Sequence, residues 1–115
     1  LGWGVKSIFL VMSVLLLVPI ASLSAPVSED IHEQNCKDLY ELAEAVMGAR
    51  QNGAPLMAML NDADKYEKNL EKRKIVKAVI MDAFKESKFS TEEYQKEQIN
   101  EFAKKYYLAC MEMYL

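Results

Sequence analysis

The side chains best suited to covalent or redox chemistry in this chain are its two cysteines, Cys36 and Cys110. An even number of cysteines predicts a disulfide where a chain reaches an oxidising compartment, and here the bridge would close a loop of about 75 residues. A redox-active or metal-binding thiol pair is the alternative. The chain has no CxxC motif and neither cysteine has an obvious activating neighbour, so we expect a structural disulfide. His32 lies four residues before Cys36, but the bridge would consume the thiol with which it could share a metal.

Two pairs of methionines have the spacing MxM, namely Met57 with Met59 and Met111 with Met113. Thioether sulfurs suit Cu(I), and copper binding is therefore one alternative function. Residues two apart on a helix point in different directions, however, and methionine also fills gaps in small cores. We therefore predict no metal-ligating residue.

The sequence offers little for catalysis. Its single histidine, His32, lies in a segment without helical periodicity, and the residues from Ala25 onward have no HExxH motif, Ser-His-Asp order or glycine-rich phosphate loop. The adjacent Glu92 and Glu93 fall where acidic residues favour a helix N-terminus. Since no group is expected to titrate near neutral pH, we predict that the protein is no enzyme and has no catalytic or cofactor-binding residue.

Four residues are candidates for contact with a protein partner: Arg50, Gln51, Tyr106 and Tyr107. Arg50 continues the apolar stripe of its helix and could anchor a partner's carboxylate, although a cation in a last helical turn also favours the helix dipole. Exposed tyrosine often marks a binding patch. The net charge of −3 gives no footprint for nucleic acid. The expected partner is thus an unidentified protein. A second copy of the chain, in a homodimer, is one of the partners considered.

The N-terminal residues resemble a secretory signal peptide. Lys6 precedes an almost uninterrupted apolar run, Ile8 to Val18, and small residues follow up to Ala25. The run is about half the length of a membrane-spanning helix, so no stable membrane anchor is expected. Small residues at the cleavage site favour a cut after Ser24. We expect residues 1–24 to be a signal peptide and the mature protein to be secreted, into the periplasm if the source is bacterial.

The mature chain is expected to be an all-α domain of about four helices. Residues 25–34 should form a flexible lead-in, and residues 35–115 a helical domain in which the disulfide joins the first and last helices. The first helix is expected from Asn35, its N-cap, to Asn52, followed by Gly53. Three further helices are expected. The second should begin at Pro55, and the third at a capping box of Asp64 with Glu67. The fourth should begin at a capping box of Ser90 with Glu93, next to an apolar contact of Phe89 with Tyr94.

Residues 35–114 resemble small uncharacterised secreted proteins of proteobacteria and their phages. The likeness rests on Cys36, the segment Met47-Gly48-Ala49-Arg50-Gln51-Asn52-Gly53, Ala83-Phe84, Tyr94, and Phe102 with Cys110. It implies a periplasmic protein with paired cysteines and implies no activity. The leading expectation is a periplasmic protein-binding or inhibitory factor. The alternatives are a holdase chaperone that exposes apolar surface and dissociates from a dimer near pH 3, the copper-binding protein, and a structural subunit without independent activity.

Overall fold

The computed structural model describes residues 28–113, and within that range all the regular structure is helical. The expected all-α fold is confirmed, as is the disulfide that joins the first and last of these helices. The expected signal peptide, residues 1–24, and its cleavage after Ser24 lie outside the described residues. The helices are α2 (Glu29–Gln51), α3 (Leu56–Tyr66), α4 (Leu70–Lys85) and α5 (Glu92–Glu112).

Helix α2 begins at Glu29, well before the expected start at Asn35. Ser28 is its N-cap, with Oγ accepting from the N–H of Ile31 at 3.3 Å. Glu29 and Asp30 place negative charge in the first turn, where it favours the helix dipole. The prediction of a flexible lead-in over residues 25–34 is therefore wrong for residues 29–34.

The C-terminal end of α2 is as expected. Gly53 has φ 93°, in the left-handed region that glycine adopts without a steric penalty. Its N–H donates to Arg50 O at 3.1 Å, and the N–H of Ala54 donates to Ala49 O at 3.0 Å. These two bonds form a Schellman motif, which satisfies carbonyls in the last turn of α2 and turns the chain toward α3.

The boundary between α3 and α4 differs from the prediction. Asp64, expected in the capping box that starts the next helix, lies inside α3. Helix α4 begins after Asn69, whose Oδ1 accepts from the N–H of Lys72 at 3.0 Å. The capping box expected from Asp64 and Glu67 therefore does not start this helix.

The start of α5 lies one residue later than expected. The N-cap is Thr91 and not the expected Ser90, and the Oγ1 of Thr91 accepts from the N–H of Tyr94 at 3.4 Å. The expected contact between Phe89 and Tyr94 does form, with ring centroids 5.9 Å apart. The apolar contact across the helix start was thus predicted correctly, while the capping hydroxyl was not.

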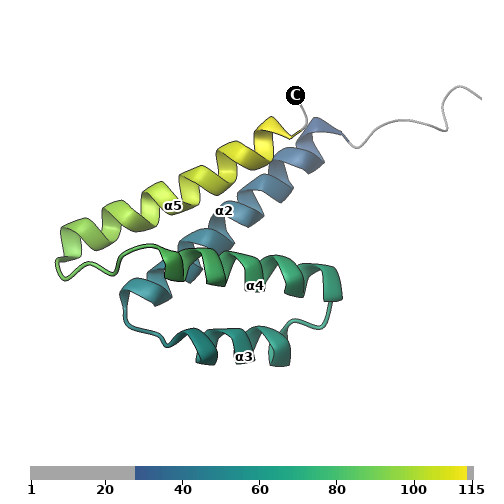
Figure 1. The fold of residues 1–115 in the computed structure, drawn as a ribbon. Helices are drawn as coiled ribbons and strands as arrows, with labels where there is room; N and C mark the ends of the chain where they lie inside the picture. Colours follow the sequence, from purple (N-terminus) through teal and green to yellow (C-terminus); the bar gives the residue numbers. More distant parts are fainter. Residues whose placement is uncertain (1–27, 114–115) are drawn as a thin grey trace, which may run out of the picture.

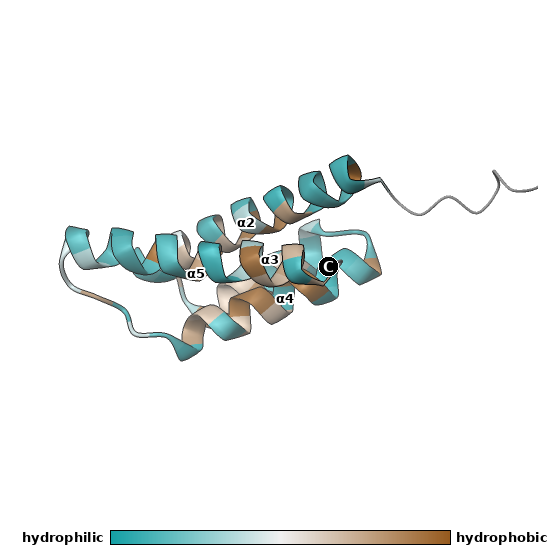
Figure 2. Cartoon of the chain, turned by 90° about the horizontal axis from the view of Figure 1, so that it is seen from above, coloured by the Kyte–Doolittle hydropathy of each residue, from teal (hydrophilic) through white to brown (hydrophobic). Residues whose placement is uncertain are grey.

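Helices α2 and α5 run antiparallel side by side, and α3 and α4 form a second antiparallel pair that lies across the C-terminal half of α2 (Figure 1). Apolar residues are prominent on α4, whereas most of α2 is hydrophilic (Figure 2). The two pairs share one buried core, to which every helix contributes. Its members are Ala43, Val46, Met47, Ala63, Val79, Ile80, Ala83, Phe102 and Ala103.

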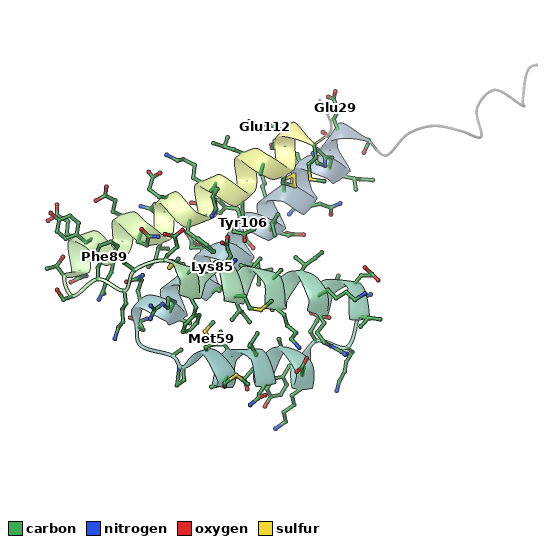
Figure 3. All side chains as sticks on the ribbon, in the orientation of Figure 1. Glu29, Met59, Lys85, Phe89, Tyr106 and Glu112 are labelled. Carbon is green, nitrogen blue, oxygen red and sulfur yellow. A yellow bond between two sulfur atoms is a disulfide. The ribbon has the colours of Figure 1, made fainter. Side chains whose placement is uncertain are left out.

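The N-terminal half of α2 and the C-terminal half of α5 project beyond the α3–α4 pair (Figure 1). We call the outer part of this projection, residues 29–38 and 107–112, which does not pack against the core, the arm. The core residues of α2 begin only at Ala43, so the arm lies outside the main core. The disulfide between Cys36 and Cys110 lies in the arm, with the two Cα atoms 5.5 Å apart (Figure 3). It therefore joins the helices where the apolar core does not reach.

Candidate functional site

A groove opens between α2 and the first turns of α4. Its apolar lining consists of Leu39 and Leu42 of α2 and Ile75 and Val76 of α4, and its volume is about 590 Å³. Leu39, Leu42 and Val76 also pack against the core, whereas Ile75 is 50% exposed. The groove exists because α2 continues past the end of the α3–α4 pair, which leaves one side of α2 uncovered.

The polar lining of the groove is acidic on balance. It includes Asp38 and Glu67, with Lys72 as the one cation. Asp38 Oδ1 accepts from Gln34 Nε2 at 3.0 Å, and Glu67 Oε1 accepts from the N–H of Asn69 at 3.2 Å. Each carboxylate thus uses one oxygen in these bonds.

The turn between α3 and α4, which closes one end of the groove, is held by long basic side chains. Arg73 Nε donates to Glu67 O at 2.9 Å, and Lys68 Nζ donates to Lys65 O at 2.9 Å. The N–H of Glu67 donates to Ala63 O at 3.1 Å. These bonds fix the turn, so the groove is formed before any partner binds.

Gln51 was expected at a partner interface but is 2% exposed. Its Nε2 donates to Ser87 O at 2.8 Å, and its Oε1 accepts from the N–H of Phe89 at 2.8 Å. Gln95 Nε2 donates to Phe89 O at 2.7 Å. The amide of Gln51 therefore ties the loop between α4 and α5 to the end of α2, inside the protein rather than on a binding surface.

Arg50 also acts within the fold. Its guanidinium lies over the ring of Phe84, 4.7 Å from the centroid, and Nη2 donates to Glu86 O at 3.3 Å. Its Nε is buried and has no hydrogen-bond partner within the described part of the chain. The cation thus lies near the C-terminal ends of both α2 and α4, where it favours both helix dipoles. The sequence left open whether Arg50 binds a partner's carboxylate or favours the dipole of its own helix. This geometry matches the second alternative.

Tyr106 joins α5 to α4, and it lies beside α4 in Figure 3. Its hydroxyl donates to Asp82 Oδ2 at 2.7 Å, and Lys105 Nζ lies 3.1 Å from the same oxygen. The hydrogen bond from Tyr106 lowers the pKa of Asp82 against the opposing effect of burial, and Lys105 adds to the lowering. Burial, and then the bond to Asp82, raise the pKa of Tyr106 above its ordinary value. This charged cluster is a polar connection between α5 and α4.

Tyr107 faces a different neighbour from Tyr106. Its ring meets that of Tyr40 edge-on, with centroids 6.3 Å apart, and so lies in the seam between α2 and α5. Tyr106 instead packs on Phe102, with centroids 5.1 Å apart. The two tyrosines are each half-buried and do not form one patch.

The methionine pairs do not converge on a common point. Met57 is 62% exposed, whereas Met59 packs against the core. Met111 is half-buried within α5, and Met113 is 79% exposed just after it. The two members of each pair therefore differ in environment, as expected for residues two apart on a helix.

His32 lies in a different place from the one that the sequence suggested. It is 8% exposed, inside the first turns of α2, and its Nε2 lies 3.5 Å from Cys36 Sγ. The imidazole and the two cysteine sulfurs form one cluster at the tip of the arm. The i,i+4 spacing of His32 and Cys36 was the available signal, and it was set aside because the disulfide uses the Cys36 thiol.

The groove between α2 and α4 is the functional feature that sequence reasoning missed. Leu39 packs against the core and also lines the groove, whereas Ile75 is 50% exposed. The angle between the two helix pairs leaves this surface open, and no local sequence pattern indicates that angle.

Comparison with known proteins finds no match: no family model, curated protein or solved structure is similar to this chain. The resemblance to secreted proteins of proteobacteria and phages therefore stays a prediction from motifs. Within residues 28–113, no helix combines the length and the apolar character needed to cross a bilayer.

Proposed function

We propose that this protein is an exported, non-enzymatic factor that binds another protein in the groove between α2 and α4. The groove itself carries the proposal. Four aliphatic side chains from two helices line a preformed hollow, and one of them, Ile75, is half exposed. Contiguous accessible apolar surface with a polar border is the ordinary mark of a protein interaction site.

The occupant that fits best is an amphipathic helix with a basic edge. Helix-in-groove recognition places apolar anchors of one helix against an apolar lining such as that of Leu39, Leu42, Ile75 and Val76. Strand addition needs an exposed sheet edge, and the described residues contain no strand. The acidic balance of the polar lining and the net charge of −3 favour lysine or arginine beside the anchors.

The proposed place of action is an oxidising compartment outside the cytoplasm, the periplasm in a bacterial source. The disulfide between Cys36 and Cys110 supports this, since such bonds persist in exported proteins and are rare in the cytosol. The signal-like composition of residues 1–24 points in the same direction.

A site-specific photo-crosslinker tests the groove directly. Placed at Ile75, it should capture a partner from an envelope extract, and the crosslinked peptide should lie in an amphipathic helix. Met81 provides the matched control because it is on the same helix and is 49% exposed, but does not line the groove. Equal capture from both positions, or crosslinking of Ile75 only to a second copy of the chain, would contradict the proposal.

Substitution measures the contribution of the groove to affinity. Ile75→Glu should weaken binding of the captured partner at least about tenfold, because burying the exposed half of an isoleucine is worth about 1–1.5 kcal/mol. Met81→Glu should leave the dissociation constant within about twofold. An unchanged affinity for Ile75→Glu would refute the assignment of the groove.

A second candidate, the acid-stress holdase, is favoured by the cluster at Asp82. Because the folded-state pKa of Asp82 is lowered, its contribution to stability is present above the unfolded value and lost as pH falls through the lowered one. Lys85, Lys105 and Tyr106 are the groups that act on this carboxylate. Its protonation weakens the polar connection of α4 to α5, and a holdase would use this to make apolar residues of α4 accessible in acid.

This alternative has its own test. A holdase would bind an apolar dye and protect an unfolding client near pH 3, and Asp82→Asn would remove part of that pH dependence. If acid leaves dye binding and client aggregation unchanged, the holdase is excluded while the groove proposal is unaffected.

A further inference from the structure

The tip of the arm brings together three side chains that can bind metal ions: His32, Cys36 and Cys110. Their ligand atoms all lie within 4.8 Å of one another. His32 is 8% exposed and Cys36 is fully buried, whereas Cys110 is half-buried and so reachable from solvent. In the oxidised protein the sulfurs are bonded to each other, and His32 lies beside the bond.

We propose that reduction of this disulfide converts the tip of the arm into a Cys2His site for a thiophilic d10 metal ion such as Zn²⁺ or Cu⁺. A dithiol reductant supplies two electrons and two protons, so the S–S bond breaks, two thiols form and the reductant becomes a disulfide. Metal binding then displaces both thiol protons to solvent, and two thiolates and one imidazole nitrogen coordinate the ion.

The spacing of the ligand atoms suits such an ion. With Zn–S and Zn–N bonds of typical length and a tetrahedral angle, sulfur and nitrogen ligands lie about 3.6 Å apart. The separation of His32 Nε2 and Cys36 Sγ is already 3.5 Å. The two sulfurs would have to move to about 3.8 Å apart. Rotation of the cysteine side chains can supply this, because their Cα atoms are only 5.5 Å apart.

The backbone presents the ligands from a fixed frame. His32 and Cys36 are one turn apart on the same face of α2, the spacing that places two ligands on one metal. Cys110 comes from α5, and the seam between the helices also includes the contact of Tyr40 with Tyr107. This seam continues into the shared core at Phe102, so the helices have packing contacts that do not depend on the S–S bond.

The proposed site is chemically selective. Two soft thiolates and an imidazole favour Zn²⁺ or Cu⁺ over hard cations, which prefer oxygen ligands. Three protein ligands satisfy trigonal Cu⁺, and for Zn²⁺ they leave one position open to water. The metal would thus replace the covalent bond between α2 and α5, and the arm would stay joined under reducing as well as oxidising conditions.

The proposal is tested by titrating the protein with Zn²⁺ before and after reduction with a phosphine, which is then removed under nitrogen. We expect one equivalent to bind only to the reduced protein, with a rise in its Tm. Co²⁺ should give thiolate-to-metal charge-transfer absorption. His32→Gln should lower the affinity at least about 100-fold, since even a group that only orients a ligand is worth up to that factor. Competition between Zn²⁺ and Cu⁺ then identifies the preferred ion.

The controls distinguish metal binding at this site from binding to methionine sulfurs and from effects of unfolding. The double variant Cys36→Ser, Cys110→Ser should bind no metal, while Met57→Leu with Met59→Leu should bind as the wild type does. Circular dichroism of the reduced protein must show that the helices persist, because unfolding on reduction also overturns the proposal. Equal binding before and after reduction, or no binding by reduced and folded protein, would refute it.

Discussion

Replacing Gln51 by leucine tests whether one buried amide holds the loop between α4 and α5. The change keeps a side chain of similar size but removes the donor to Ser87 O and the acceptor for the N–H of Phe89. Both bonds are part-buried, so each backbone group left unpaired costs about 1–1.5 kcal/mol. The new apolar surface offsets up to about 1 kcal/mol. The expected net loss in the free energy of unfolding is about 2 kcal/mol.

Urea unfolding followed by circular dichroism measures this loss. For a small protein with a slope of about 1–2 kcal/mol per molar urea, the midpoint should fall by about 1–2 M. Gln34→Leu is the matched control because Gln34 is exposed and makes one surface bond to Asp38. It should change stability by less than about 0.5 kcal/mol. If Gln51→Leu costs no more than this control, the role assigned to Gln51 is wrong.

A charged variant, Gln51→Glu, tests the two hydrogen bonds of the Gln51 amide separately. In Gln51→Glu the carboxylate can still accept from the N–H of Phe89, but it cannot donate to Ser87 O. Once protonated, the carboxyl regains a donor. The loss in free energy of unfolding of Gln51→Glu relative to the wild type should therefore shrink as pH is lowered from about 7 to about 4. A deficit that is independent of pH would show that the bond to Ser87 contributes nothing.

Three further perturbations have defined outcomes. Tyr106→Phe should lower the free energy of unfolding by about 1–2 kcal/mol at neutral pH in urea titrations, since it removes a part-buried hydrogen bond to a charged acceptor. The difference should shrink as pH falls below 3.8 and through the lowered pKa of Asp82, and a pH-independent difference would contradict the role of that charge. Gly53→Ala should cost about 1–2 kcal/mol by the same assay because of its φ of 93°, and an unchanged midpoint would contradict the Schellman end of α2. Reducing the bond between Cys36 and Cys110 in metal-free buffer should lower the free energy of unfolding by about 4 kcal/mol. Amide hydrogen exchange should then accelerate first in the arm, and uniform acceleration across the core would argue against a separate arm.

The helical class and the disulfide could be predicted from the sequence because both follow from local composition and compartment. The start of α2 could not be predicted from periodicity. Its first turns belong to the arm, where only His32 and Cys36 face inward, so no regular apolar stripe develops before Leu39. The capping signal at Ser28 was present in the sequence, and it was the better guide.

Local capping signals also failed where a longer-range contact competes with them. Asp64 offered a helix start, but α3 continues through it because the neighbouring Ala63 packs in the core. The burial of Gln51 could not be predicted either, since its partners lie 36 and 38 residues away in a loop. Polar residues at a helix end have the same local pattern whether they face solvent or a distant backbone. The groove depends on the angle between helix pairs, which no local pattern encodes.

The position of the disulfide has a mechanical consequence. The described chain begins and ends at the tip of the arm, beside the bridge from Cys36 to Cys110 (Figure 3). A pulling force applied at the two ends passes along residues 28–36, across the sulfur bond and out through residues 110–113. The residues between positions 36 and 110 are off this load path. A protein anchored at one end and loaded at the other would therefore keep its groove and its core intact under tension, as long as the bond holds.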